Sequence, residues 1–583
     1  MTAPTWNLEM IFPDGLQGDA FSSALSAAEA EARDLLASGD SLPALPEQLS
    51  VWVEWLLAAD DATQRLWQCS TFSHCLTCAD TNDRGAARAE ARARAAFARL
   101  RRAWVGPENL IASGSEDGVE ALLSRPEIAH MRPMLEKIRR NRRLLLPLSQ
   151  QQLARELSED GLQGWGNLYD RLSGQLEVEI DGERIAAGQA NNRLGSTDRP
   201  ERTAALAALG ESWKAQEEHC AQALSHITGW RQVLNDRRGV DELADTLAAN
   251  RMSRETLEAM MASAARQAPL LKRYMTAKAG LLGQEKLGWE DLSAPLANPN
   301  SAQSWEQSQA FILDHFASYH SDLADFAANA FDRRWIEGED RPGKRQGGWC
   351  ASVPLSGESR IFMTFGNTFR GTVTLAHELG HAYHNWVCRD LSPSQRQITS
   401  TLAETASVFA ESLVRDAALK AADSRESRLA MLDARLMAGV SFLMNIPARY
   451  AFERALYPLR REGLLDPDVL TQTMLDCQKT AYQGHLESWY PHFWASKLHF
   501  FISGRAFYNY PYTFGYLFAQ LVYRKVRADG DHAAYVALLR RTGWDDAEPL
   551  AAECLGLDLT RTETWDLAAA GLEEDLEAFL AEI

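Results

Sequence analysis

The chain lacks the features that mark secreted and membrane proteins. Only 8 of its 583 residues are cysteine, which is too few for a disulfide framework in so long a chain. No apolar run approaches the roughly 20 residues that a membrane-spanning helix needs. Residues 1–15 include Glu9 and Asp14 and have no basic start followed by an apolar core, unlike a signal peptide. We therefore expect a cytoplasmic protein that has no membrane partner.

The chain also has no strongly basic segment. Asp and Glu outnumber Lys and Arg by 79 to 60, which gives a formal net charge of -19. A nucleic-acid-binding protein usually carries a basic face, and the densest basic run here, at 139–143, is typical of a solvated helix face. No phosphate-cradling G-x-x-x-x-G-K-[ST] loop occurs, so nucleotide hydrolysis has no support. We expect no nucleic-acid partner.

Helical patterns are what the sequence does contain. Strong helix formers, or apolar residues repeating every three or four positions, predict helices over 87–104, 206–230 and 425–456. Strand signals are few, at 175–180, before a turn at Asp181-Gly182, and at 360–365. The predicted fold class is therefore mostly α with a small β-sheet.

The length of the chain predicts more than one lobe, because 583 residues exceed what one hydrophobic core usually organises. The polar stretch 188–200 ends in turn-forming residues and can act as a connection. We expect an N-terminal helical region over 1–190 and a second region, which carries the motif described next, over 191–583.

One short motif indicates chemistry. His377-Glu378-Leu379-Gly380-His381 has the H-E-x-x-H pattern. On a helix, residues four apart lie nearly above one another, so both imidazoles can bind one metal ion. Glu378 lies about 100° around the helix from His377 and can reach a metal-bound water without binding the metal. The alternative is a pair of histidines on the surface of an amphipathic helix.

A third ligand would distinguish these alternatives. The metzincin pattern requires glycine at position 384 and histidine at position 387, where this chain has His384 and Val387. Glu404, inside a helical pattern that runs to about Arg415, can supply a carboxylate instead. Two histidines and one glutamate leave a fourth position open for water, as a catalytic zinc site requires. Glu404 as a surface carboxylate is the alternative.

Two neighbours have open roles. His384 lies one turn beyond His381, on the same helix face as His377 and His381. It can either hydrogen-bond in the site or be a buried structural histidine. Glu411 lies two turns beyond Glu404, and it can either orient a ligand histidine or be a solvated carboxylate.

The segments Thr374–Ala382 and Glu404–Ser407 resemble the motif segments of the oligoendopeptidase F branch of the thimet oligopeptidase family of zinc metallopeptidases. The resemblance extends over most of the chain and is densest at 343–411 and 491–519. It implies a mostly helical, two-lobed ellipsoid with a small β-sheet beside a deep, zinc-containing substrate channel. It also implies that Glu404 is the third zinc ligand and that substrates are unfolded oligopeptides.

The same resemblance implies a role for His499 and for tyrosines near it. The family uses a histidine and tyrosines in this region to stabilise the oxyanion and hold the substrate, because a donor must meet the carbonyl oxygen as charge develops. Tyr508 and Tyr512 have the spacing of the oligoendopeptidase F branch, whereas the segment around Tyr516 resembles the thimet-type ending. Both alignments stay open, and each tyrosine can instead be a packing residue.

The sequence thus predicts a zinc-dependent endopeptidase with one zinc ion per chain, bound by His377, His381 and Glu404. Glu378 is the expected general base that activates the zinc-bound water. Two imidazoles and a carboxylate favour zinc over cobalt or manganese. Two other functions are a dipeptide-releasing carboxypeptidase, which needs a cationic anchor for the substrate C-terminus, and a silent peptide-binding protein. The sequence does not indicate an oligomeric state.

Overall fold

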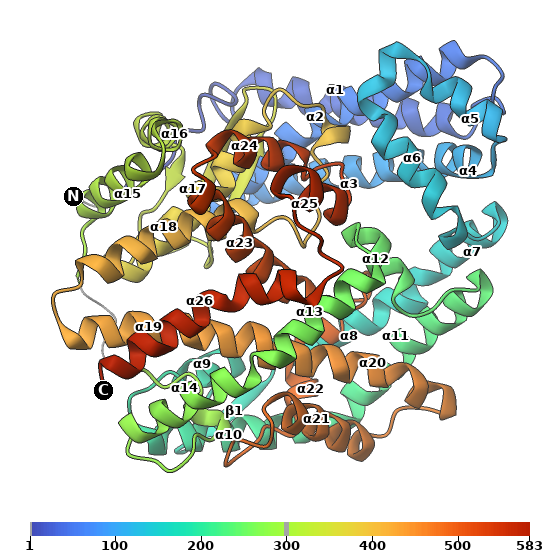
Figure 1. Cartoon of the computed structure of the whole chain (residues 1–583). Helices are drawn as coiled ribbons and strands as arrows, with labels where there is room; N and C mark the ends of the chain where they lie inside the picture. Colours follow the sequence, from blue (N-terminus) through green and yellow to red (C-terminus); the bar gives the residue numbers. More distant parts are fainter. Residues whose placement is uncertain (1–2, 297–301) are drawn as a thin grey trace. The chain divides into compact units, whose positions relative to one another are not determined.

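The computed structural model describes residues 3–296 and 302–583 (Figure 1). The chain divides into two compact units. Each unit is assembled from three separate segments of the chain. Unit 1 comprises Met1–Arg142, Asn300–Ala418 and Val522–Gly556, and unit 2 comprises Arg143–Pro299, Leu419–Leu521 and Leu557–Ile583. The predicted class, mostly helical with small sheets and more than one lobe, is confirmed. The channel and the regional boundary at residue 190 stay predictions.

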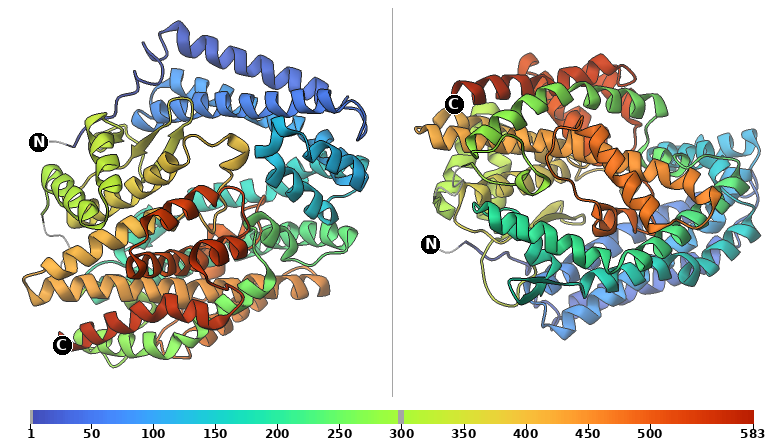
Figure 2. Two further views of the ribbon diagram at one scale, coloured as in Figure 1. Left: turned by 45° about the horizontal axis from the view of Figure 1, so that its top comes forward. Right: turned by 90° about the horizontal axis from the view of Figure 1, so that it is seen from below.

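Unit 1 begins with three long helices that pack against one another, as Figure 2 shows in its blue segments. Their shared core includes the buried side chains of Trp52, Leu56 and Leu100. The helices and strands of unit 1 are α1 (Asp19–Gly39), α2 (Leu49–Ala79), α3 (Arg84–Ala103), α4 (Val105–Ser113), α5 (Glu116–Leu123), α6 (Arg132–Arg140), α15 (Trp305–Tyr319), α16 (Ser321–Asp332), β3 (Ile336–Glu337), β4 (Trp349–Val353), β5 (Glu358–Phe362), α17 (Phe369–Val387), most of α18 (Thr405–Ala421), α24 (His532–Arg541) and α25 (Ala547–Leu555).

Unit 2 is helical apart from one hairpin, among the residues that the structure describes. Its elements are α7 (Leu148–Ser158), α8 (Gly164–Gly174), β1 (Glu177–Ile180), β2 (Glu183–Ala186), α9 (Ala187–Arg193), α10 (Arg199–Lys214), α11 (Glu217–Arg238), α12 (Ala244–Asn250), α13 (Arg254–Arg266), α14 (Ala268–Leu281), α19 (Arg425–Val440), α20 (Ile446–Glu462), α21 (Pro467–Ala481), α22 (Phe493–Ser496), the first part of α23 (Tyr510–Asp529) and α26 (Thr562–Ala581). Helices α19 and α26 lie side by side (Figure 1).

The predicted helices are present, with one correction. The range 87–104 corresponds to α3, and 425–456 falls in α19, α20 and the single π-helical turn Ser441–Asn445 between them. The range 206–230 is two helices, because α10 ends at Lys214 and α11 begins at Glu217. Two acidic residues in the first turn of α11 favour a helix start there, since they complement the helix dipole.

Both predicted strands are present. Strand β1 pairs with β2 through the Asp181-Gly182 turn, where both residues have positive φ, 55° and 82°. This is the backbone that a two-residue hairpin turn requires. In unit 1, β5 is the central strand of a three-stranded sheet, parallel to β3 and antiparallel to β4. The end of β5 leads within a few residues into α17, which carries the H-E-x-x-H motif.

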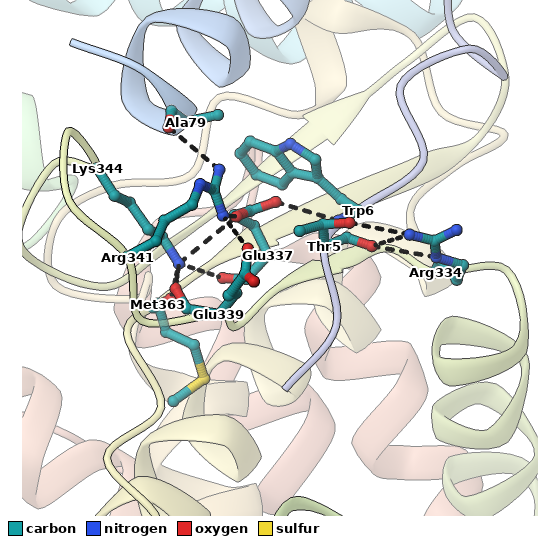
Figure 3. A network of polar contacts seen from close by, with 9 residues as sticks. All are labelled: Thr5, Trp6, Ala79, Arg334, Glu337, Glu339, Arg341, Lys344 and Met363. Atoms are coloured by element: carbon teal, nitrogen blue, oxygen red, sulfur yellow. Dashed lines mark hydrogen bonds and ion pairs between the residues drawn. The ribbon is translucent and has the colours of Figure 1, made fainter. Parts of the chain in front are cut away.

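A polar network fixes the irregular segment that leads into β4 (Figure 3). The ammonium group of Lys344 donates to the backbone carbonyls of Glu337 and Met363 at 3.2 and 2.6 Å. The buried Glu337 carboxylate pairs with Arg341 and accepts a hydrogen bond from the Trp6 amide at 3.2 Å. Because buried polar groups need partners, these contacts hold the segment against the sheet and thereby set the position of β4.

One stretch of the described residues, Arg425–Glu462, is long and apolar enough to cross a membrane by length and composition alone. The sequence analysis expected no such stretch. Half of its most apolar window is buried inside the protein, as in the core helix of a soluble protein, so the finding is weak support for a membrane partner. The absence of a membrane partner stays a prediction.

Candidate metal centre

Helix α17 presents the motif from a buried position in unit 1. The Thr368 side chain accepts a hydrogen bond from the Gly371 amide at 3.3 Å and caps the helix start. Leu375 and Leu379 are fully buried, and the helix packs against β4 and β5. These buried leucines anchor the helix, while the side chains of the two motif histidines stay about one quarter exposed, at 26% and 23%.

His377, His381 and Glu404 meet at one point. The Nε2 atoms of His377 and His381 lie 3.4 and 3.3 Å from the same oxygen, Oε2 of Glu404. Ser407 donates a hydrogen bond to that oxygen at 2.7 Å, which fixes the carboxylate. The structure therefore brings together three ligand atoms that come from α17 and from the residue before α18.

Gly380 explains how α17 and α18 approach so closely. A Cβ atom at this position would lie 2.4 Å from the Ala406 carbonyl oxygen and 2.6 Å from the Ser407 Cα. Real Cβ atoms do not approach backbone at such distances, so only glycine fits here. Gly380, the fourth residue of the motif, thus allows Glu404 to reach the histidines.

The three ligand atoms have the spacing of a zinc site. Zinc bonds to nitrogen and oxygen are about 2.0–2.1 Å long, so ligands at tetrahedral angles lie about 3.3 Å apart. The two His–Glu distances of 3.4 and 3.3 Å match that value, and the three atoms form one of two potential metal-binding groups among the described residues. The donor set therefore fits a divalent metal ion.

Glu411 lies behind His377. Its Oε2 is 3.1 Å from His377 Nδ1, and its other oxygen accepts from Arg415 Nε at 2.6 Å. Burial opposes protonation of His377, but Glu404 and Glu411 outweigh burial and raise its pKa to about 10. Such a site stabilises positive charge, and Glu411 holds the imidazole with Nε2 facing the other two ligands.

Glu378 differs from the other carboxylates of the site. Its side chain is 5% exposed, and Oε2 has no hydrogen-bond partner among the described residues. Burial raises its pKa above the usual range. A Cβ at Gly348, just before β4, would lie 3.1 Å from Glu378 Oε1, so the glycine leaves room beside the carboxylate. A buried oxygen without a hydrogen-bond partner can accept a hydrogen bond from a water molecule or from a substrate.

His384 does not belong to this centre. It is buried, and its Nε2 lies 3.1 Å from the Leu539 carbonyl oxygen and 2.8 Å from the Thr542 hydroxyl. Of the two roles that the sequence left open, the structure favours the structural one.

The second potential metal-binding group consists of His320, Asp322 and His532. The two imidazole rings stack with centroids 3.7 Å apart and planes 11° apart. Both nitrogens of His532 already contact hydroxyl groups, of Tyr319 at 3.1 Å and of Tyr383 at 3.0 Å. Because nitrogen lone pairs lie in the ring plane, stacked rings do not direct them to one point. The motif group is therefore the better candidate.

Comparison with known proteins identifies the family of this chain. Residues 300–569 match Peptidase family M3, and residues 111–177 match the family described as Oligopeptidase F. The chain belongs to peptidase family M3. It is therefore a metallopeptidase, and the resemblance to the oligoendopeptidase F branch is confirmed. Oligopeptidase PepF of Bacillus subtilis (strain 168) is 24% identical over 98% of this chain and 86% of that protein.

Solved structures confirm the fold of the M3 peptidase. A crystal structure of a protein from Chlamydophila abortus has a TM-score of 0.86 and 18% identity and covers 100% of both chains. Oligoendopeptidase-F from Enterococcus faecium has a TM-score of 0.69 and 18% identity and covers 96% of this chain and 99% of that one.

The other predicted site residues of the M3 peptidase belong to unit 2. His499 stacks on Tyr508, with centroids 5.6 Å apart, and its edge faces Tyr512 at 5.8 Å. Tyr512 is 37% exposed. Tyr516 is in a different stack, on Phe442 at 4.8 Å. His499, Tyr508 and Tyr512 thus form one aromatic cluster.

Two further residues next to this cluster were missed by the sequence analysis. Arg449 from α20 and Lys497 from the segment after α22 line the same cavity as His499 and Tyr512. Their sequence positions carry little signal, because one belongs to an ordinary amphipathic helix and the other is a single lysine. Only the proximity of Lys497 to His499 in the sequence could have drawn attention to it.

Proposed function

We propose that this M3 peptidase is a zinc-dependent endopeptidase that hydrolyses internal bonds of oligopeptides, with Glu378 as general base. The observation that carries the proposal is the convergence of His377, His381 and Glu404 on one point beside the unpartnered oxygen of Glu378. This combination is the ligand set and base of a hydrolytic metal site.

His377, His381 and Glu404 would hold one zinc ion per chain, and Glu411 would keep His377 in the orientation for binding. Zinc supplies a Lewis acid, which acidifies water and polarises a carbonyl group. Two imidazoles and one carboxylate suit zinc, although cobalt and manganese accept similar ligands. Metal content therefore has to be measured together with activity.

Glu378 would transfer a proton from the attacking water to the leaving amine. A carboxylate whose pKa is raised by burial is a stronger base than an exposed glutamate. It takes a proton from the attacking water and later delivers that proton to the nitrogen of the leaving amine. The space beside Gly348 allows the carboxylate to stay close to the reacting atoms during both transfers.

His499, Tyr508 and Tyr512 would donate hydrogen bonds to the oxyanion or hold the substrate. Burial beside Arg449 and Lys497 lowers the pKa of His499 to about 4, so the imidazole is neutral at pH 7. A neutral imidazole and two phenols can donate hydrogen bonds without adding charge. Tyr516 is a weaker candidate because its ring stacks on Phe442.

The names of relatives support the substrate class. The Bacillus subtilis relative is an oligopeptidase, and the Enterococcus faecium structure is an oligoendopeptidase. Oligopeptides in the cytoplasm are the proposed substrates. A deep substrate channel and a regional boundary near residue 190 belong to the same proposal.

The test is cleavage of a short, internally quenched peptide that is blocked at both ends, by the wild type and by Glu378→Gln. Metal content is measured in both proteins by elemental analysis. We expect about one zinc per chain in both, with kcat of the variant lower by roughly 100- to 10,000-fold, because general acid–base catalysis contributes that much. The exposed Glu573→Gln on α26 is the matched control and keeps full activity.

The other outcomes separate the alternatives. Zinc without cleavage of any blocked peptide, together with cleavage of unblocked ones, would indicate a carboxypeptidase or another exopeptidase. Binding without any cleavage would indicate a silent peptide-binding protein. Absence of zinc in metal-replete protein would overturn the site itself.

A further inference from the structure

A cavity of about 470 Å³ in unit 2 contains two cationic side chains, Arg449 and Lys497. None of the described residues that line it is an aspartate or glutamate. His499 and Tyr512 form part of the same wall, and Trp289, Phe442 and Tyr482 supply aromatic surface. The size, and a lining that combines apolar and aromatic surface with polar groups, are typical of a ligand pocket.

Both cations are positioned by the same aromatic ring. Lys497 Nζ lies 4.7 Å and Arg449 Cζ lies 5.1 Å from the centre of the buried Phe493 ring. Such cation–π contacts orient a charge without neutralising it. Arg449 also donates to Asn509 Oδ1 at 3.4 Å, while its Nε is buried with no partner among the described residues. Hydrogen-bonding capacity therefore remains on the guanidinium.

The positive charge of the pair is not compensated within the described residues, because neither cation has an ion-pair partner there. Other buried cations of unit 2 do have one. Lys278 lies 3.0 Å from an oxygen of Asp433, and Arg202 lies 2.7 Å from one of Asp291. Removing a charge from water without a counter-ion is costly, so this unpaired and only partly exposed pair is suited to an anionic ligand.

The lack of a counter-ion affects the pKa values of both cations. Burial, with no carboxylate to oppose it, lowers the pKa of Arg449 to about 10. Burial and the neighbouring Arg449 lower the pKa of Lys497 to about 8. A bound anion would reverse these shifts, since an opposite charge nearby favours the protonated form of both groups.

We propose that Arg449 and Lys497 form a binding site for a carboxylate group of the peptide substrate. This inference rests on the proposed oligopeptidase function and deepens it. A guanidinium and an ammonium match carboxylate oxygens through charge-assisted hydrogen bonds, and the aromatic walls can accept the side chain next to the carboxylate. The carboxylate is either the C-terminus of the peptide or an Asp or Glu side chain, and both share the same chemistry.

The experiment compares quenched peptides of one sequence that differ only in charge. One pair ends in a free carboxylate or in a carboxamide, and a second pair has glutamate or glutamine at one position near the C-terminus. The proteins are the wild type, Arg449→Gln, Lys497→Gln and a control, Arg461→Gln. Arg461 is an exposed cation on α20, the helix of Arg449, and it pairs with Asp236 at 2.8 Å. KM and kcat are measured separately for each peptide.

In the wild type, we expect KM to be at least about tenfold lower for the recognised carboxylate peptide than for its neutral partner, as one charge-assisted contact provides. Lys497→Gln and Arg449→Gln should reduce this ratio toward one by raising KM for the carboxylate peptide alone, whereas Arg461→Gln should keep it. The ratio should also fall as the pH rises above about 8, where Lys497 loses its proton. Which pair shows the effect identifies the carboxylate.

Equal KM values within both pairs in an active wild type would overturn the inference and leave the proposed function intact. If the wild type cleaves none of the peptides, the proposed function fails, and the carboxylate site is then tested by calorimetric binding of the same peptides to the wild type. If Arg449→Gln does not fold, the wild type and Lys497→Gln decide the outcome with the same peptide pairs.

Discussion

A Cβ atom on Gly380 would lie 2.6 Å from the Cα of Ser407, so α17, which carries the two motif histidines, and α18, which begins directly after Glu404, touch at a residue without a side chain. Gly380→Ala must therefore push α18 away from α17 or distort one of them. Because overpacking costs about 1–3 kcal/mol, we expect a lower melting temperature and weaker zinc binding, with Glu404 displaced from the histidines.

The matched control is Gly210→Ala on helix α10. Gly210 is also helical, but a Cβ there would meet no atom within 4 Å. This variant should be as stable as the wild type or slightly more stable, because alanine favours helices over glycine. Melting curves and zinc titrations of both variants check the prediction, which is contradicted if Gly380→Ala binds zinc as tightly as Gly210→Ala.

Glu411 should control metal affinity without binding the metal. Glu411→Gln keeps the shape of the side chain but removes the charge that faces His377 Nδ1 and Arg415. Loss of such a partner typically weakens metal binding by about 10- to 100-fold. Competition with a zinc-binding dye measures the change, and Glu573→Gln is again the control. Unchanged affinity in Glu411→Gln would show that the charge of Glu411 does not support metal binding.

His384 should make stability depend on pH. Burial lowers its pKa from an ordinary value of 6.5 to about 4. Between these values the unfolded chain binds a proton that the folded chain does not, so the free energy of unfolding rises with pH and levels off above about 6.5. A shift of this size corresponds to about 3 kcal/mol at most.

Urea unfolding of the wild type and of His384→Gln between pH 4.5 and 7 measures this contribution. The variant loses the hydrogen bonds to Leu539 and Thr542 and should be less stable at pH 7, but its stability should change less across this pH range. Parallel curves for both proteins would show that His384 does not titrate in this range.

The sequence predicted those parts of the site that are local in the chain. His377, Glu378 and His381 are identified by helical spacing, and the fully buried Leu375 and Leu379 are visible as an apolar stripe. Arg449 and Lys497 could not be identified in this way, because they meet only through the packing of separate segments around Phe493. The break between α10 and α11 was missed because apolar periodicity continues across it.

The two alignments of the tyrosine region predict different kinetics. Tyr512 and Tyr508 form a cluster with His499, so Tyr512→Phe and Tyr508→Phe each remove a hydroxyl from the proposed oxyanion donors. Loss of one such donor costs about 100- to 1,000-fold in kcat. Tyr516→Phe keeps the ring that stacks on Phe442 and should change kcat little.

Single-turnover cleavage of a doubly blocked peptide by the three variants distinguishes the alignments, with zinc content confirmed to be equal. A large fall in the rate constant for Tyr512→Phe or Tyr508→Phe supports the register of the oligoendopeptidase F branch. A large fall for Tyr516→Phe alone would support the thimet-type register instead and would assign Tyr508 and Tyr512 to packing around His499. The hydroxyl is the only group that changes in each variant, so a loss of rate at constant zinc content reports on the donor itself.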